Sequence, residues 1–289
     1  MAIFLYYYCL KYDFNGYKPM KALVLNCFAS LVVLALITSC QAEQDQSTSA
    51  AAEPQSEQNP PADGFDMVNS DAEAMEIADL VMEAMGGRNA WDNTRYLAWN
   101  FFGNRHLTWD KYSGQVRISF PDSTTYLVNV NDGSGKAIKD GVEVLHPDSL
   151  DKELTRAKSI WINDSYWLVM PFKLKDSGVT LKYVGFENTT SGTPSHVLEL
   201  TFKEVGVTPQ NRYLVYVDNA TNLVNQWAFY REAGQDTANF VLPWDNYQQH
   251  GSILLSDNRG ERNLTEVRVF DSLPQEVFTS LEVLDINQY

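Results

Sequence analysis

Apolar and polar residues alternate over short runs through most of the chain after residue 95, and turn-forming residues separate the runs. RYLAWNFF at 95–102 and RHLTWD at 105–110 flank Gly103-Asn104, a spacing typical of a β-hairpin. YLVYV and LVNQWAFY flank the turn segment DNAT in the same way. The pattern predicts an antiparallel meander of about ten or eleven strands. After the first hairpin, the candidate strands are 115–120, 126–130, 179–186, 196–204, 211–218 and 222–231, which contain YLVYV and LVNQWAFY, and 237–242, 251–256 and 263–270.

Two stretches have helical spacing instead. In the first, IADLVMEAM at 77–85, apolar residues recur with the period of a helix, Ser70 and Glu73 form a capping box, and Gly86 ends the helix. The second covers 148–161, and the apolar segment WLVMPF follows it as further helix or packed loop. The sequence therefore predicts a leading helix before the strands and a helical insert between them.

The amino-terminal region has the layout of an export signal. Lys21 precedes the apolar run 22–39, and the segment ITSC, which ends at Cys40, resembles the lipobox of bacterial lipoproteins. The resemblance implies a signal peptide at 1–39, with Met20 as an alternative start, and a lipid on the Cys40 thiol. An uncleaved transmembrane anchor is the other interpretation, because the run is near the shortest length that spans a bilayer.

A polar segment follows the lipobox. Residues 41–70 are rich in Gln, Ser, Ala, Pro and acidic residues and contain no Lys or Arg. Such a composition predicts a disordered tether, so the lipidated cysteine and the tether together occupy 40–70. Gln41 is not the Asp of the inner-membrane retention signal, which favours the outer membrane, on either its periplasmic or its outer face. No linker divides the remaining residues, 71–289, and we expect them to form one domain.

Charge and cysteine usage narrow the function further. The 289-residue chain has a formal net charge of -15, which argues against nucleic acid as a partner. Its cysteines are Cys9, Cys27 and Cys40, so the folded part contains no disulfide and no thiolate site. Motifs such as HExxH and GxGxxG are absent, and we expect no catalytic residues, no metal and no cofactor. His106 and Asp110, which share a strand face, are the one pair on which an enzyme could be built.

The combination of a leading helix, a long meander, a helical insert and an export signal resembles the LolA/LolB lipoprotein-carrier superfamily. RYLVYVDNATNLVNQWAFY resembles a hairpin common in these proteins, and NDSYWLVMPFKLKDSGVTL resembles segments of uncharacterised bacterial lipoproteins of the same type. The resemblance covers residues 71–285. It implies an α+β, mostly β fold, in which an unclosed, curved half-barrel carries a helical lid. It also implies that an acyl chain, lipid or lipidated protein binds in a concave apolar cavity.

Bulky apolar side chains fall on one face of the predicted strands and in the insert. In a half-open barrel they line a cavity, whereas in a closed sandwich they fill the core, and both interpretations stay open. We expect a monomeric, membrane-anchored, non-catalytic binding protein; a structural or protein-interaction lipoprotein with a filled core is the alternative. The candidate cavity residues are Trp99, Phe101, Leu107, Trp109, Ile118, Phe120, Tyr126, Trp167, Phe172, Tyr183, Tyr213, Trp227 and Phe229.

Overall fold

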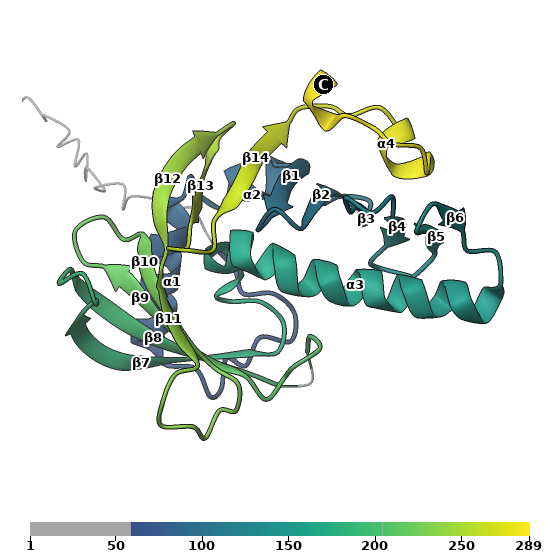
Figure 1. Cartoon of the computed structure of the whole chain (residues 1–289). Coiled ribbons are helices and arrows are strands. Elements are labelled where there is room, and N and C mark those ends of the chain that lie inside the picture. Colours follow the sequence, from purple (N-terminus) through teal and green to yellow (C-terminus); the bar gives the residue numbers. More distant parts are fainter. Residues whose placement is uncertain (1–58, 204) are drawn as a thin grey trace, which may run out of the picture. The chain divides into compact units, whose positions relative to one another are not determined.

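A computed structural model describes residues 59–203 and 205–289 (Figure 1). The predicted signal peptide 1–39, the predicted lipidation site Cys40 and the tether residues 41–58 lie outside the described residues. Within the described part of the chain, no helix combines the length and the apolar character needed to cross a membrane.

Residues 59–70, which the sequence assigns to the tether, contact the domain. The amide of Ala62 donates a hydrogen bond to the carbonyl of Lys175 at 2.9 Å, and the side chain of Phe65 is buried. The segment as a whole is polar, but Phe65 packs its apolar side chain into the domain. The packed part of the chain therefore includes these residues as well as those from residue 71 onwards.

The first sheet is an antiparallel meander to which the last strand of the chain returns (Figure 1). Its strand order is β14-β1-β2-β3-β4-β5-β6, so β14 pairs with β1. Alternation along each strand gives the sheet one apolar inner face and a second face with mixed character. The strands are β1 (Tyr96–Phe101), β2 (Arg105–Asp110), β3 (Gln115–Ser119), β4 (Thr125–Asn129), β5 (Gly135–Lys139), β6 (Val142–Glu143) and β14 (Leu264–Phe270).

The second sheet is also an antiparallel meander, with the order β11-β10-β9-β8-β7, and a separate hairpin, β12-β13, follows it. The hairpin predicted around the segment DNAT is confirmed as β9 and β10. The mostly β fold of unclosed antiparallel sheets is confirmed, although the meander is divided in two by the helical insert. The strands are β7 (Val179–Asn188), β8 (Pro194–Phe202), β9 (Arg212–Asp218), β10 (Val224–Tyr230), β11 (Phe240–Pro243), β12 (Asp245–His250) and β13 (Ile253–Asn258).

The insert is one long helix, α3, where the sequence suggested a helix at 148–161 and a second segment. No Gly or internal Pro interrupts the chain between its first and last turn, so the helix continues to Val169 and tightens into a 3-10 turn, η1. The helical elements are α1 (Ala72–Ala84), α2 (Arg88–Asn93), α3 (Pro147–Val169), η1 (Met170–Lys173), α4 (Glu276–Thr279) and η2 (Ile286–Gln288).

The start of α1 differs from the predicted capping box. The N-cap residue is Asp71, and no side-chain cap bond is made at this helix start. Ser70 instead accepts a hydrogen bond from the amide of Leu181 at 3.0 Å, and the Asp71 carboxylate accepts one from the amide of Tyr183 at 3.1 Å. These side chains therefore fasten the helix start to the edge strand β7, a tertiary contact that local sequence does not reveal.

Helix α3 fills the space over the inner face of the first sheet (Figure 1). Trp109 packs edge-on against Trp161 with ring centroids 5.2 Å apart, and the Tyr126 hydroxyl donates to Glu153 of the helix at 2.7 Å. This half of the domain is a packed core. Its fully buried members include Leu97, Trp99, Leu107, Val116 and Ile118.

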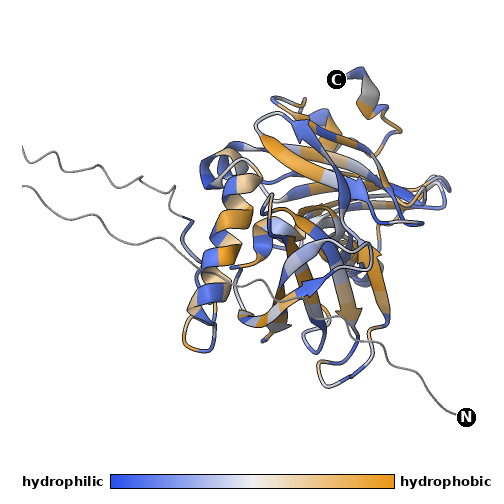
Figure 2. Ribbon diagram, turned by 90° about the vertical axis from the view of Figure 1, so that its left-hand side faces the viewer, coloured by the Kyte–Doolittle hydropathy of each residue, from blue (hydrophilic) through white to orange (hydrophobic). Residues whose placement is uncertain are grey.

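The carboxyl-terminal segment covers the outer face of the same sheet, on the side away from α3 (Figure 1). Phe278 of α4 stacks on Tyr96 with centroids 6.0 Å apart. The buried Arg117 donates to the carbonyls of Ser280 at 2.7 Å and Glu282 at 2.5 Å. Both faces of the first sheet are thus occupied. Figure 2 shows the matching alternation of apolar and polar residues along the ribbons.

Candidate ligand-binding cavity

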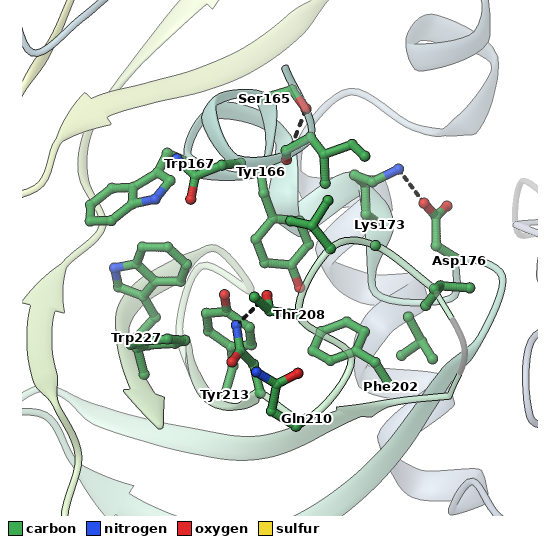
Figure 3. A pocket seen from close by; sticks show the side chains of 18 of the residues that line it. Ser165, Tyr166, Trp167, Lys173, Asp176, Phe202, Thr208, Gln210, Tyr213 and Trp227 are labelled. Carbon is green, nitrogen blue, oxygen red and sulfur yellow. Dashed lines mark hydrogen bonds and ion pairs between the residues drawn. The ribbon is translucent and has the colours of Figure 1, made fainter. Parts of the chain in front are cut away.

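A cavity of about 550 Å³ lies between the second sheet and the last turns of α3 (Figure 3). The inner faces of β8 to β11 form one wall, α3 and η1 form another, and the loop 205–210 between β8 and β9 forms a third. This volume lies in the range of cavities that hold one small ligand. The domain therefore has a filled half under the first sheet and a hollow half under the second.

Strand register arranges the lining side chains in rows. Trp227 of β10 lies opposite Leu242 of β11. One row further along, Phe229 lies opposite Phe240 on one side and Tyr213 of β9 on the other. Because alternate residues of a strand share a face, the aromatic rings of three neighbouring strands meet on the cavity side of the sheet.

The aromatic rings of the cavity wall also hold one another in position by direct packing. Trp167 of α3 packs edge-on against Trp227 with centroids 4.8 Å apart, and Tyr213 stacks on Trp227 at 5.4 Å. Phe229 and Phe240 stack at 5.0 Å. Such contacts hold large apolar surfaces in place without a ligand, so the wall is pre-formed.

Tyr166 reaches into the cavity region from α3 (Figure 3). Its hydroxyl oxygen is shielded from solvent and has no hydrogen-bond partner among the residues that the structure describes. Burial raises the pKa of Tyr166 well above its ordinary value, and burial raises the pKa of Tyr213 to about 12. Both phenols therefore stay neutral at physiological pH.

Polar and charged side chains gather away from the tryptophans. Figure 3 shows Lys173 and Asp176, which form an ion pair at the cavity rim. The exposed Arg231 follows the end of β10 and also lines the cavity, but its guanidinium has no partner in the described part of the chain. The hydroxyl oxygen of Thr208 accepts a hydrogen bond from Nδ2 of Asn211 at 2.7 Å. The cavity is thus apolar at one end and polar at the other.

A buried arginine supports the aromatic end. Nη2 of Arg259 donates to the carbonyl of Trp167 at 2.8 Å, in the last turn of α3, where the helix dipole favours a cation. The guanidinium lies 3.4 Å from the centroid of Trp244, whose ring packs edge-on against Trp227. Burial lowers the pKa of Arg259, but an arginine side chain remains protonated at neutral pH. Arg259 therefore ties the end of α3 to the connection between β13 and β14.

The structure separates the predicted cavity residues into two groups. Trp167, Tyr213, Trp227 and Phe229 line the cavity. The other nine do not line it. Phe172 stacks on Trp91 at 4.3 Å, and the hydroxyl of Tyr183 hydrogen-bonds with Nδ1 of His196 at 3.2 Å. The remaining seven, Trp99, Phe101, Leu107, Trp109, Ile118, Phe120 and Tyr126, belong to the core around the first sheet.

Several lining residues were not predicted. Phe202 and Phe240 lie on strands whose alternation was recognised, so their face could have been inferred. Tyr166 lies in a segment whose helical state was left open. Arg231 ends the candidate strand 222–231 in step with Trp227 and Phe229, so its face could also have been inferred, whereas the loop 205–210 has no periodic signal.

The two residues of the one candidate catalytic pair, His106 and Asp110, do not contact each other. His106 and Asp110 lie at opposite ends of β2. The Asp110 carboxylate accepts hydrogen bonds from Arg95 at 2.9 and 3.0 Å and from Ser113 at 2.8 Å. Nε2 of His106 lies 3.8 Å from a carboxylate oxygen of Glu266 instead. Within residues 59–203 and 205–289, no group of three or more His, Cys, Asp or Glu side chains is arranged to hold a metal.

Comparisons of the sequence find no matching family model and no matching curated protein. Comparison of the structure finds similar folds. A DUF1329 family protein from Desulfovibrio piger has a TM-score of 0.40 and 15% identity, over 72% of this chain and 97% of that one. A domain named for outer membrane lipoprotein sorting, from Vibrio parahaemolyticus, has a TM-score of 0.38 and 11% identity, over 71% and 96%.

A LolA superfamily protein from Nitrosomonas europaea has a TM-score of 0.34 and 10% identity, over 72% of this chain and 97% of that one. The chain is thus similar in fold to DUF1329 and LolA-superfamily proteins.

Proposed function

We propose that this protein is an envelope lipoprotein that binds one acyl-chain amphiphile in the cavity between α3 and the second sheet. The observation that carries the proposal is the pre-formed cavity of about 550 Å³, one end of which is lined by aromatic rings. Moving apolar surface out of water contributes roughly 0.8 kcal/mol for each buried methylene. A lipid chain against Trp227 and Phe229 gains this contribution without displacing a packed side chain.

The anchor is part of the same proposal. The lipobox ending at Cys40 supports acylation there, and Gln41 supports retention at the outer membrane. A protein fixed at a membrane exchanges lipid with that surface or with a carrier and does not shuttle. Its role is therefore to receive or sense the amphiphile.

Native mass spectrometry of the chain carrying Cys40→Ser, exported behind a cleavable secretory signal peptide in place of residues 1–39, tests the binding function without interference from the anchor. We expect an acyl amphiphile that co-purifies and is released on denaturation. An apo mass, with no uptake of laurate or dodecanol and no change in tryptophan fluorescence when either is added, would contradict the proposal. That outcome would favour a protein-interaction role.

Metabolic labelling with a palmitate analogue tests the anchor separately. We expect the label on the wild-type chain in the membrane fraction and not on Cys40→Ser. Labelling of both chains, or of neither, would contradict lipidation at Cys40.

A further inference from the structure

The rows of cavity-lining side chains on β9 and β10 continue one residue beyond the paired strands, and there the side chains become polar. Tyr230 pairs with Arg212 at the last position of the β9–β10 ladder. The next residues, Arg231 and Asn211, both line the cavity on the same side as Phe229 and Tyr213. The cavity surface of the sheet therefore runs from tryptophan through phenylalanine and tyrosine to arginine.

Charge pairing singles out Arg231. Lys173, a second cation that lines the cavity, already forms an ion pair with Asp176 (Figure 3). The backbone amide of Arg231 donates a hydrogen bond to Asn239 Oδ1 at 2.7 Å, but its guanidinium has no acidic or hydrogen-bonding partner among the residues that the structure describes. A guanidinium offers paired donors that match the two oxygens of a carboxylate or phosphate. In a chain with a net charge of -15, a cation is needed wherever an anion is to bind.

Polar groups of the neighbouring loop supplement this cation. Thr208 Oγ1 accepts from Asn211 Nδ2, which leaves the Thr208 hydroxyl hydrogen free to donate. Gln210 lines the same region and is exposed. Figure 3 shows Thr208 and Gln210 on the loop beneath the ring of Tyr166. Together with Arg231, they offer several donors at the polar end of the cavity.

We propose that Arg231, Thr208 and Gln210 bind the anionic head group of a single-chain amphiphile whose acyl chain lies against Phe229 and Trp227. The head is a carboxylate or a phosphate, and the cavity volume fits one chain better than the several chains of a mature lipoprotein. This inference rests on the proposed function and adds to it the charge, chain number and orientation of the ligand.

The experiment measures binding of three probes to the full chain carrying Cys40→Ser, by displacement of a fluorescent acyl probe. The probes are laurate, lauroyl lysophosphatidylglycerol and dodecanol, which have the same chain length and different heads. Arg231→Gln is the test variant. Arg156→Gln is its matched control, because Arg156 is an exposed arginine of α3 beside Glu153.

We expect Arg231→Gln to weaken the binding of the anionic probe roughly five- to tenfold and to change dodecanol binding less than about twofold. Arg156→Gln should change neither. In the wild type, tighter binding of laurate identifies the head group as a carboxylate, and tighter binding of lauroyl lysophosphatidylglycerol identifies it as a phosphate. Thr208→Val should weaken the same probe by a smaller factor.

Two results would overturn the inference and leave the proposed function in place. One is equal loss of all three probes in Arg231→Gln, which would mean a structural role for Arg231. The other is a wild-type chain that binds dodecanol as tightly as both anions. Failure of the wild type to bind any probe would instead overturn the proposed function.

Discussion

Arg105 and Asp164 form a two-pronged ion pair, with nitrogen–oxygen distances of 2.6 and 2.7 Å, that joins β2 of the first sheet to α3. The Asp164 side chain is fully buried. It immediately precedes Ser165 and Tyr166, which line the cavity. The pair therefore holds the filled half and the hollow half of the domain together at the turn of α3 where they meet.

Arg105→Met should strongly destabilise the domain. It leaves the Asp164 carboxyl in the core without its cation, a change that costs about 3–5 kcal/mol in comparable sites. The free energy of unfolding in urea measures this. Lys182→Met is the control: Lys182 and its partner Asp71 are both largely exposed, so solvent screens the pair and its loss should cost less than about 1 kcal/mol. Equal effects of the two variants would show that the Arg105 pair does not join the two halves.

Substitutions in the filled half of the domain should change its free energy of unfolding, whereas substitutions in the hollow half should change its affinity for the ligand. Trp99→Leu, in the filled half, should lower the free energy of unfolding by roughly 2–4 kcal/mol and leave the affinity of the folded chain for laurate unchanged. Phe229→Ala, at the cavity wall, should change stability by less than about 1 kcal/mol, because the ring is only partly buried, and weaken laurate about tenfold. Urea titration and probe displacement measure the two effects. The reverse assignment of effects would place the ligand under the first sheet.

Tyr166→Phe should stabilise the ligand-free protein. The hydroxyl is shielded and unpartnered in the described chain, so its removal relieves a desolvation cost of about 1 kcal/mol. Tyr126→Phe is the matched control, because that hydroxyl donates to Glu153 and its loss should lower stability by about 1 kcal/mol. Thermal unfolding of both variants decides this. A lower melting temperature for Tyr166→Phe would mean that its hydroxyl is bonded in solution.

Acid should weaken the domain partly through His106. Burial lowers the pKa of His106 in the folded state, so the unfolded chain binds a proton more readily. The contribution of His106 to the free energy of unfolding is therefore complete above the ordinary histidine pKa of about 6.5. It is lost as the pH falls from there toward the folded-state pKa.

His106→Asn should remove this part of the pH dependence. The measurement is the free energy of unfolding of both chains over a series of pH values. The pKa of His250 is also lowered by burial, but His250 is common to both chains, so the difference between the curves reports His106. Parallel curves would show that the folded chain accepts the proton at His106 without cost.

The alternation of apolar residues predicted most of the strands and the β9–β10 hairpin, because a period of two is a property of local sequence. It could not divide the aromatic residues between core and cavity. Trp99 and Trp227 both lie on alternating strands and both are buried, but Trp227 lines the cavity and Trp99 does not. What lies opposite a strand face depends on the path of a distant helix.

The capping box failed for a similar reason. Ser70 and Glu73 have the right spacing, yet the strand β7 passes beside them and offers its amides to Ser70 and Asp71. A tertiary partner thus replaced a local one. Arg231 falls on the same strand face as Trp227 and Phe229, but the sequence does not show that this face borders a cavity where the strand ends.

The pairing of β14 with β1 has a consequence for how the chain folds. These strands stand at opposite ends of the described sequence, and every other strand lies between them. Closing so long a loop is entropically unfavourable and slow, so β1 keeps an unpaired edge until the last segment arrives. An incomplete chain therefore presents an apolar strand edge that invites aggregation. The first sheet is therefore complete only when the chain through Phe270 is present.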